Sequence, residues 1–332
     1  MLNNATILIT GGSGSFGKKF VQMTMQKYNP SRLVIFSRDE MKQWEMAQLY
    51  KNDDRVNFFI GDVRDKDRLF RACNKIDYIV HAAALKIVPS LEYNPFEPIK
   101  TNIMGAMNVI DCAINQRVKR VVALSTDKAC KPINIYGATK FCSDKLFTAG
   151  NAYSGTQDTR FVVVRYGNVM GSRGSIIPYF RSLSASGELP ITDERMTRFM
   201  ITLEEAVELV WHALEDSKGG EIYVKKIPSM KVVDIAKVIA PHAKLKIIGI
   251  RPGEKIHEEM ICPEDALFTY EYDSHFKITS SIYNLKTTDS RFDGGIRCLE
   301  GFHYSSDKNK ELMAPQTLAQ WIEKEYGTSA AI

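Results

Sequence analysis

Short apolar runs alternate with amphipathic stretches over the first 170 residues of the chain. The runs cover residues 5–10, 32–37, 56–63, 77–84, 120–126 and 160–169, and most are followed by a segment with helical spacing. Because these runs are continuously hydrophobic, they are typical of strands buried on both faces of a sheet. The pattern predicts an α/β fold with a doubly wound parallel sheet.

The pattern changes after about residue 170, where Gly, Pro and charged residues are mixed between short elements. We expect a dinucleotide-binding domain over residues 1–170, with later segments returning to its sheet, and a smaller, mixed substrate domain over most of residues 171–332. Near the end, Leu318, Trp321, Ile322 and Glu325 have helical spacing in "PQTLAQWIEKEYG" and predict a C-terminal helix.

Composition indicates an ordinary globular protein, with 44% hydrophobic and 25% charged residues in a chain of 332. The net charge of +5 is spread along the chain, which argues against nucleic acid or a membrane surface as a partner. No signal peptide and no apolar run of membrane-spanning length is recognised, so we expect a cytoplasmic protein. The cysteines lack C-x-x-C spacing, which predicts buried, reduced thiols and no metal site: Cys73, Cys112, Cys130, Cys142, Cys262 and Cys298.

A glycine-rich turn joins the first strand to the first helix. Gly11, Gly14 and Gly17 have the spacing G-x-x-G-x-x-G. In this strand–turn–helix context the pattern predicts the pyrophosphate site of a Rossmann fold, because glycines let the backbone approach the ligand and the helix start offers free N–H groups. The alternative is a tight turn without a ligand.

The residues after the second strand decide between NAD and NADP. Arg38 follows Ser37, and Lys42 lies one helical turn further on. An arginine at this position accommodates the 2′-phosphate of NADP, whereas a carboxylate binds the 2′-hydroxyl of NAD. The sequence therefore favours NADP, although Asp39 keeps NAD open and a solvated loop arginine is the alternative.

Tyr136 and Lys140 form a Y-x-x-x-K pair in "IYGATK". On a helix they share one face, so the ammonium is expected to lower the pKa of the phenol and make it a base. Chance alone produces such pairs, and Tyr304 with Lys308 is a second one that we expect at the surface. Only the first pair follows a strand that ends in "LSTDK".

Several motifs together resemble a known family. They are "TGGSGSFG", "SRDE", "HAAALK", "LSTDKA", "YGATK", "RYGNVMGSRGS", "PITDERMTRF" and "RPGEKIHE". As a set they resemble the extended short-chain dehydrogenases/reductases and, among these, the C5-inverting UDP-N-acetylglucosamine 4,6-dehydratases. The resemblance extends from about residue 5 to residue 262, and it implies a Rossmann fold with tightly bound NADP that is recycled within each turnover.

The resemblance also implies the catalytic roles. Tyr136 takes the proton from O4 while C4 gives hydride to the cofactor, Asp127 protonates the departing O6 hydroxyl, and Lys128 removes the C5 proton. We expect Lys86, Lys140 and the oxidised nicotinamide together to depress the pKa of Lys128 so that it can act as a base. The alternative is that Asp127 and Lys128 form an exposed ion pair in a turn.

The remaining site residues are matched to family positions. Those expected to bind the cofactor are Gly11, Gly14, Ser15, Phe16, Gly17, Ser37, Arg38, Asp39, Lys42, Asp62, Val63, Ala82, Lys86, Thr101, Tyr136, Lys140 and Val169. Those expected to bind the UDP-sugar are Lys86, Asn168, Arg198 and Arg251.

Two positions depart from the family pattern, and alternatives to its activity stay open. Ile87 replaces a common histidine and Met200 a common tryptophan, which bears on the choice of sugar. A UDP-sugar 4-epimerase would use Tyr136 and Lys140 without the neighbouring acid and base. A C5-retaining dehydratase and a dinucleotide-sensing binding protein are further alternatives. We expect a homo-oligomer, a dimer or larger.

Overall fold

A ten-stranded sheet forms the centre of the computed structural model, which describes residues 1–280, 282 and 289–327. The strand order is β16-β14-β15-β10-β6-β5-β4-β1-β2-β3. Neighbours from β3 to β10 pair in parallel, whereas β15, β14 and β16 extend the sheet with antiparallel pairing. The strands are β1 (Thr6–Thr10), β2 (Arg32–Ser37), β3 (Val56–Ile60), β4 (Tyr78–His81), β5 (Arg120–Leu124), β6 (Arg160–Arg165), β10 (Ile222–Lys225), β14 (Thr269–Glu271), β15 (His275–Ile278) and β16 (Ile296–Arg297). The predicted α/β class and parallel sheet are confirmed.

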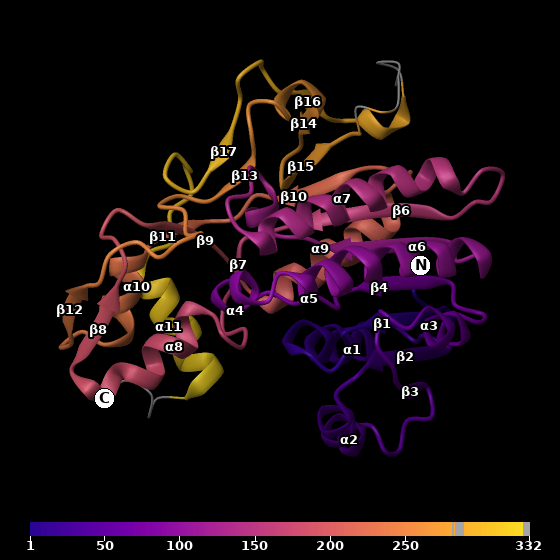
Figure 1. Cartoon of the computed structure of the whole chain (residues 1–332), viewed down its shortest axis with the longest axis horizontal. Coiled ribbons are helices and arrows are strands. Elements are labelled where there is room, and N and C mark those ends of the chain that lie inside the picture. The colour runs from indigo at the N-terminus through magenta and orange to yellow at the C-terminus, as the bar shows by residue number, and fades with distance from the viewer. Residues whose placement is uncertain (281, 283–288, 328–332) are drawn as a thin grey trace.

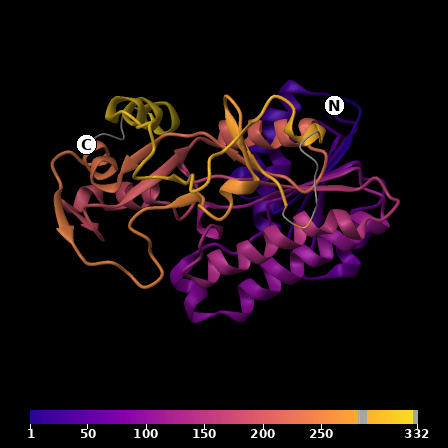
Figure 2. The same ribbon diagram turned by 90° about the horizontal axis from the view of Figure 1, so that it is seen from above.

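Helices cover both faces of this sheet (Figure 2). On one face α6 contacts both α3 and α7, and on the other α1 contacts α9. The helices of this part are α1 (Ser15–Lys27), α2 (Glu40–Leu49), α3 (Lys66–Ala72), α4 (Val88–Tyr93), α5 (Phe96–Pro98), the π-helix η1 (Ile99–Met104), α6 (Gly105–Asn115), α7 (Ile135–Tyr153) and α9 (Leu203–Asp216). Since α9 and β10 lie beyond residue 170, the chain returns to the sheet after leaving it; the expected domain boundary stays a prediction.

A second, smaller body, which we call the small lobe, packs beside the sheet (Figure 1). Its helices are α8 (Ile176–Leu183), α10 (Val232–Ile239) and α11 (Pro315–Tyr326), and its strands are β8 (Glu188–Ile191) and β12 (Lys244–Ile247). They enclose a separate core that includes Phe180, Leu189, Ile235 and Leu318. The predicted C-terminal helix is confirmed as α11.

The remaining elements are short. They are β7 (Asn168–Val169), β9 (Thr197–Ile201), β11 (Ser229–Lys231), β13 (Glu259–Ile261), β17 (Tyr304–Ser305) and the 3₁₀ segments η2 (Asp127–Ala129), η3 (Ser184–Ser186), η4 (Ala266–Phe268) and η5 (Ser290–Phe292). The strand order reverses between β1 and β4, so the carboxyl ends of these strands open a crevice where doubly wound proteins bind ligands. No described helix is both long and apolar enough to span a membrane.

Candidate active site

A cavity of about 910 Å³ lies where the carboxyl ends of the parallel strands meet the small lobe. Its walls hold every predicted site residue except Asp127, which is fully buried behind them. The predicted residues that line it are Gly11, Gly14, Ser15, Phe16, Gly17, Ser37, Arg38, Asp39, Lys42, Asp62, Val63, Ala82, Lys86, Thr101, Lys128, Tyr136, Lys140, Asn168, Val169, Arg198 and Arg251. Residues that are far apart in the sequence are thus brought to one cavity.

The backbone of the glycine turn is packed too closely for side chains at two of its glycines. Gly11 has a φ of +66°, and a Cβ atom on Gly17 would lie 2.3 Å from the carbonyl oxygen of Gly12. Helix α1 starts after Gly14 without a side chain on its first N–H groups, which stay free for a phosphate. The buried hydroxyl of Thr101 also lines the cavity and has no hydrogen-bond partner among the described residues. These features fit a bound dinucleotide.

Two cations lie at the expected ribose end, each beside a carboxylate. Arg38 places Nη1 3.4 Å from Oδ2 of Asp62, and Lys42 forms an ion pair with Asp39. Asp39 also begins α2 by accepting the Lys42 N–H at 3.0 Å, and its bonds to Lys42 lower the pKa of this carboxyl. The ribose end therefore offers both cations and carboxylates to the adenosine half of a dinucleotide.

The turn of Thr126, Asp127 and Lys128, which we call the catalytic turn after its predicted role, follows β5. The hydroxyl of Thr126 accepts the N–H of Lys128 at 3.4 Å, which starts η2, and donates to Oδ1 of Asp127 at 2.9 Å. Asp127 is completely buried, and this burial raises the pKa of its carboxyl. The raised pKa suits a group that must deliver a proton.

Helix α7 comes unusually close to this turn. Asn134 caps the helix by accepting the N–H of Gly137 at 2.7 Å. Gly137 permits the approach, because a Cβ atom there would lie only 2.2 Å from the carbonyl oxygen of Lys128. Tyr136 and Lys140 consequently share the cavity with Lys128.

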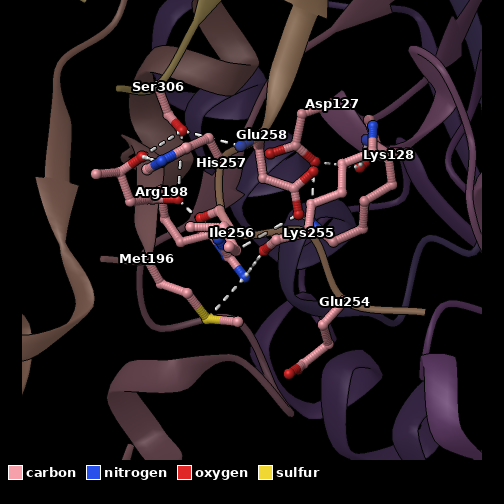
Figure 3. A network of polar contacts seen from close by, with 12 residues as sticks. Asp127, Lys128, Met196, Arg198, Glu254, Lys255, Ile256, His257, Glu258 and Ser306 are labelled. Carbon is pink, nitrogen blue, oxygen red and sulfur yellow. Dashed lines mark hydrogen bonds and ion pairs between the residues drawn. The ribbon is translucent and has the colours of Figure 1, made fainter. Parts of the chain in front are cut away.

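The ammonium of Lys128 bridges two carboxylates (Figure 3). Its Nζ atom lies 2.9 Å from Oδ1 of Asp127 and 3.1 Å from Oε1 of Glu258. Burial by itself would lower the pKa of Lys128, but the charges of both carboxylates outweigh it and raise the pKa above its ordinary value. Among the protein's own groups the expected depression of this pKa is therefore wrong, because the effect of Glu258 was not foreseen.

The pKa of Tyr136 also departs from expectation. Burial raises it to about 12, although the charge of Lys128 and a hydrogen bond between the Tyr136 and Thr126 hydroxyls act in the opposite direction. Lys140 is itself buried, and burial lowers the pKa of its ammonium. The expected lowering of the phenol pKa is thus wrong, because desolvation outweighs the neighbouring positive charges.

The predicted substrate residues differ in how exposed they are and in how many of their donors are already hydrogen-bonded. Lys86 lies in the cavity wall, where the surrounding protein and then the charge of Lys128 lower the pKa of its ammonium. Arg251 is 54% exposed and pairs with Glu254. Arg198, by contrast, is buried and donates to three backbone carbonyl oxygens at 2.7 to 3.0 Å. Its guanidinium therefore holds the segment that carries Glu258.

Three residues of the site were missed in the sequence. Glu258 ends the quoted motif region, but nothing local distinguishes it from neighbouring acidic residues. Thr126 and Asn134 had a recognisable signal: each is a polar residue directly before a helical segment, the usual composition of an N-cap. Of the three, only Glu258 required the tertiary structure.

Two sequence-based expectations about neighbouring residues are corrected or refined. Tyr304 is buried rather than at the surface, and its hydroxyl hydrogen-bonds the backbone N–H and carbonyl of Ile227. Of the two departures from the family pattern, Ile87 lines the cavity, whereas Met200 is buried outside its wall. The change at position 87 is therefore the one placed to contact a ligand.

The cysteines are free, but not all are buried as expected: Cys142 is exposed and Cys298 partly so. The thiols of Cys130 and Cys262 and the carboxylate of Asp265 lie within 4.8 Å of one another. The guanidinium of Arg165 is 3.7 Å from that carboxylate and already supplies a positive charge. We therefore interpret this cluster as a thiol pair beside an ion pair.

Comparisons with known proteins identify the family. The model of the polysaccharide biosynthesis protein family matches residues 7–280. A UDP-N-acetylglucosamine 4,6-dehydratase (inverting) from Campylobacter jejuni is 50% identical over 98% of this chain and 100% of its own length. A UDP-glucose 4-epimerase from Rickettsia canadensis is 40% identical over 84% of both chains.

Solved structures agree on the fold. The structure of Pen from Bacillus thuringiensis has a TM-score of 0.89 and 36% identity, and the match covers 98% of this chain and 99% of Pen. The dTDP-glucose 4,6-dehydratase DesIV from Streptomyces venezuelae, solved with NAD and TYD bound, has a TM-score of 0.67 and 23% identity over 76% of this chain and 86% of its own. The chain belongs to the polysaccharide biosynthesis protein family and, within it, to the inverting UDP-N-acetylglucosamine 4,6-dehydratases of the extended short-chain dehydrogenase/reductase group.

Proposed function

We propose that this chain is a UDP-N-acetylglucosamine 4,6-dehydratase, a hydro-lyase that inverts C5. The product is UDP-2-acetamido-2,6-dideoxy-β-L-arabino-hex-4-ulose, a precursor for pseudaminic acid or a related 6-deoxy amino sugar. The observation that carries this proposal is the 50% identity with an inverting dehydratase over 98% of the chain. Apart from Asp127, which is buried beside them, the groups that such a reaction requires also line one cavity.

A nicotinamide dinucleotide, when bound, would take hydride from C4 and return it to C6, so that no cofactor is consumed. The glycine turn and the start of α1 would hold its pyrophosphate. We favour NADP because Arg38 and Lys42 lie at the ribose end, with NAD as the alternative because Asp39 and Asp62 lie beside them.

The chain's own residues would move the protons. Tyr136 accepts the proton of O4, and the resulting 4-ketone acidifies the hydrogen on C5. Asp127 protonates the departing O6 hydroxyl, in keeping with the raised pKa of this buried carboxyl. Lys128 takes the C5 proton, for which its ammonium must first lose a proton, and a different donor on the opposite face of the ring returns a proton to C5, which inverts this centre. Lys140 contributes positive charge beside the phenol.

Substrate binding would use both bodies of the protein. Arg251 at the cavity rim can exchange its pairing with Glu254 for a phosphate of the UDP group. Asn168 and Lys86 line the wall near the catalytic turn and are proposed to contact the sugar. Arg198 is proposed to support the binding site indirectly, by holding the segment that carries Glu258, since most of its donors already bind backbone oxygens.

A second candidate is a UDP-sugar 4-epimerase, favoured by the 40% identity with the Rickettsia protein. Incubation with UDP-N-acetylglucosamine in deuterated water, followed by NMR of the product, separates the two. A dehydratase with inversion gives a 4-keto-6-deoxy sugar of the L-arabino series with deuterium at C5. The galacto epimer without deuterium would establish the epimerase, and retained D-configuration would establish the retaining dehydratase.

We further propose a homo-oligomer and a cytoplasmic location. Large apolar side chains are exposed along the connected helices α4 to α7, namely Tyr93, Phe96, Met104, Met107 and Phe141. Such a face suits a second copy of the chain. Sedimentation velocity of the Met107→Glu, Phe141→Glu variant tests this, with Trp44→Ser on α2 as an exposed apolar control. Cell fractionation tests the location.

A further inference from the structure

Glu258 is the second carboxylate on the Lys128 ammonium, and it comes from a distant part of the chain. It directly precedes β13, is 2% exposed and lines the cavity. Its Oε1 atom lies 3.1 Å from Nζ of Lys128 (Figure 3). The other oxygen, Oε2, has no hydrogen-bond partner among the described residues. A buried charge of this kind depends on its ionic partners.

The backbone of Glu258 is fixed on both sides. Its N–H donates to Oγ of Ser306 at 2.9 Å, and its carbonyl oxygen accepts the Ser306 N–H at 2.8 Å. The Ser306 hydroxyl in turn lies 2.7 Å from that of Thr197. The carboxylate is therefore delivered to Lys128 by a rigid support.

Arg198 is the other cation beside Glu258, but it is the more distant one. Its Nε atom lies 3.9 Å from Oε1, compared with 3.1 Å for Nζ of Lys128. The Nη atoms of Arg198 already donate to backbone carbonyl oxygens. The main ionic partner of Glu258 is thus Lys128.

We propose that Glu258 is a positioning residue that acts through Lys128: it holds the ammonium beside Asp127 and sets the pH at which this group gives up its proton. The proposal rests on the proposed function, in which Lys128 is the base for C5. Glu258 would keep Lys128 in its ammonium form in the resting enzyme. Neutralising Glu258 would let Lys128 lose its proton at a lower pH.

The charges that face Lys128 come from several elements. Asp127 of its own turn and Glu258 favour the ammonium, whereas Arg198 of β9 and Lys86 of the loop after β4 disfavour it. Lys255 acts on Glu258, and Tyr136 of α7 faces the same group as a neutral phenol. Removing the Glu258 charge leaves two nearby cations against one carboxylate, so the net effect is a lower pKa of Lys128.

The test measures the charge of Lys128 directly in the full-length, NADP-loaded protein. Acetic anhydride reacts only with the neutral amine, so at pH 8 the labelling rate of Lys128, read by peptide mass spectrometry, is proportional to the amine fraction. A carboxylate at this distance shifts a pKa by about 1 to 3 units, so Glu258→Gln should raise the rate about 10- to 1000-fold. The labelling rate of Lys131 in the same sample is the internal reference. The control variant is Glu264→Gln, which removes an exposed carboxylate paired with Lys131 and should leave the labelling rate of Lys128 unchanged.

A Glu258→Gln rate equal to that of the wild type overturns the proposal. If this variant fails to fold, Glu258→Asp decides, because its shorter side chain weakens the ion pair and should raise the labelling rate about threefold. No rise would overturn the proposal.

In turnover, the rising limb of kcat/KM against pH should move to lower pH in Glu258→Gln with little change in KM. A lower kcat on an unmoved limb would mean a structural role and would also overturn the proposal. Absence of dehydration by the wild type refutes the proposed function, while the labelling still decides the role of Glu258.

Discussion

The side-chain amide of Asn134 donates a hydrogen bond of 2.8 Å to the carbonyl oxygen of Gly253, while its Oδ1 atom accepts the N–H of Gly137 at 2.7 Å. One side chain therefore starts the helix that carries Tyr136 and also holds the loop that carries Arg251. The loop belongs to the side of the cavity proposed to bind UDP, so the catalytic helix and the nucleotide end are mechanically connected.

Replacing Asn134 with Ala should affect both stability and substrate binding. Loss of the cap is expected to lower the free energy of unfolding by about 1 kcal/mol. Loss of the bond to Gly253 should raise KM for the UDP-sugar by several-fold because the Arg251 loop is no longer held. Urea unfolding and initial-rate kinetics measure the two effects.

Asn134→Asp separates these two contributions. Aspartate keeps the cap, since its carboxylate can accept the Gly137 N–H, but it has no donor for Gly253. We expect nearly normal stability with a raised KM. A normal KM in this variant would mean that the hydrogen bond to Gly253 does not hold the loop.

Arg38 is expected to select NADP. Arg38→Ala should weaken NADP binding about tenfold, because a charged hydrogen bond to the 2′-phosphate is lost, while NAD binding changes little. Isothermal titration with both dinucleotides measures this. The control is Arg64→Ala, since Arg64 lies 2.8 Å from the same Asp62 carboxylate but does not line the cavity. Equal losses for both dinucleotides would contradict the assignment.

Local patterns in the sequence were sufficient for the six parallel strands from β3 to β6 and for the glycine turn. The predicted strand at residues 32–37 coincides with β2, and the apolar run at 160–169 is divided into β6 and β7, which pair in different sheets. Such features depend on near neighbours. Gly17 is an example, since the carbonyl that would clash with a side chain there belongs to Gly12 of the same turn.

The charge states of the site could not be predicted in this way. Whether Lys128 is a ready base depends on which distant carboxylate lies beside it, and no periodicity identifies Glu258. The same applies to Tyr136, whose pKa is set more by burial than by the helical neighbour visible in the sequence. Both errors arose because desolvation and long-range contacts are properties of the tertiary structure.

His81 should make the fold sensitive to acid. It is 1% exposed, its Nδ1 atom lies 2.8 Å from Oγ1 of Thr10, and burial together with the charge of Lys140 lowers its pKa to about 3. In the unfolded chain the imidazole takes up a proton near pH 6.5. Between these values the unfolded state binds the extra proton, so stability is lost as the pH falls, by about 1.4 kcal/mol per unit.

Urea unfolding at several pH values between 7 and 4 measures this effect. His81→Gln should be less stable at pH 7 because it disturbs the core. Its free energy of unfolding should nevertheless fall less steeply with decreasing pH, because about one proton fewer is taken up on unfolding. The same change at exposed His242 is the control. An unchanged slope in His81→Gln would show that another group causes the acid sensitivity.

Tyr136→Phe should stop the reaction before the ketone forms. The phenol lines the cavity, and with a pKa raised to about 12 by burial it is neutral at ordinary pH, so it must release its proton before it can accept that of O4. Without the hydroxyl the O4 proton has no acceptor, and the rate should fall by about 10² to 10⁴-fold.

NMR of the Tyr136→Phe reaction in deuterated water should show no deuterium at C5, since exchange requires the ketone. Calorimetry should still detect binding of the UDP-sugar to this variant. Tyr304→Phe is the matched control: its hydroxyl is buried, bonds the Ile227 backbone and does not line the cavity, so this variant should lose stability but keep turnover. Deuterium at C5 in Tyr136→Phe would show that another group removes the O4 proton.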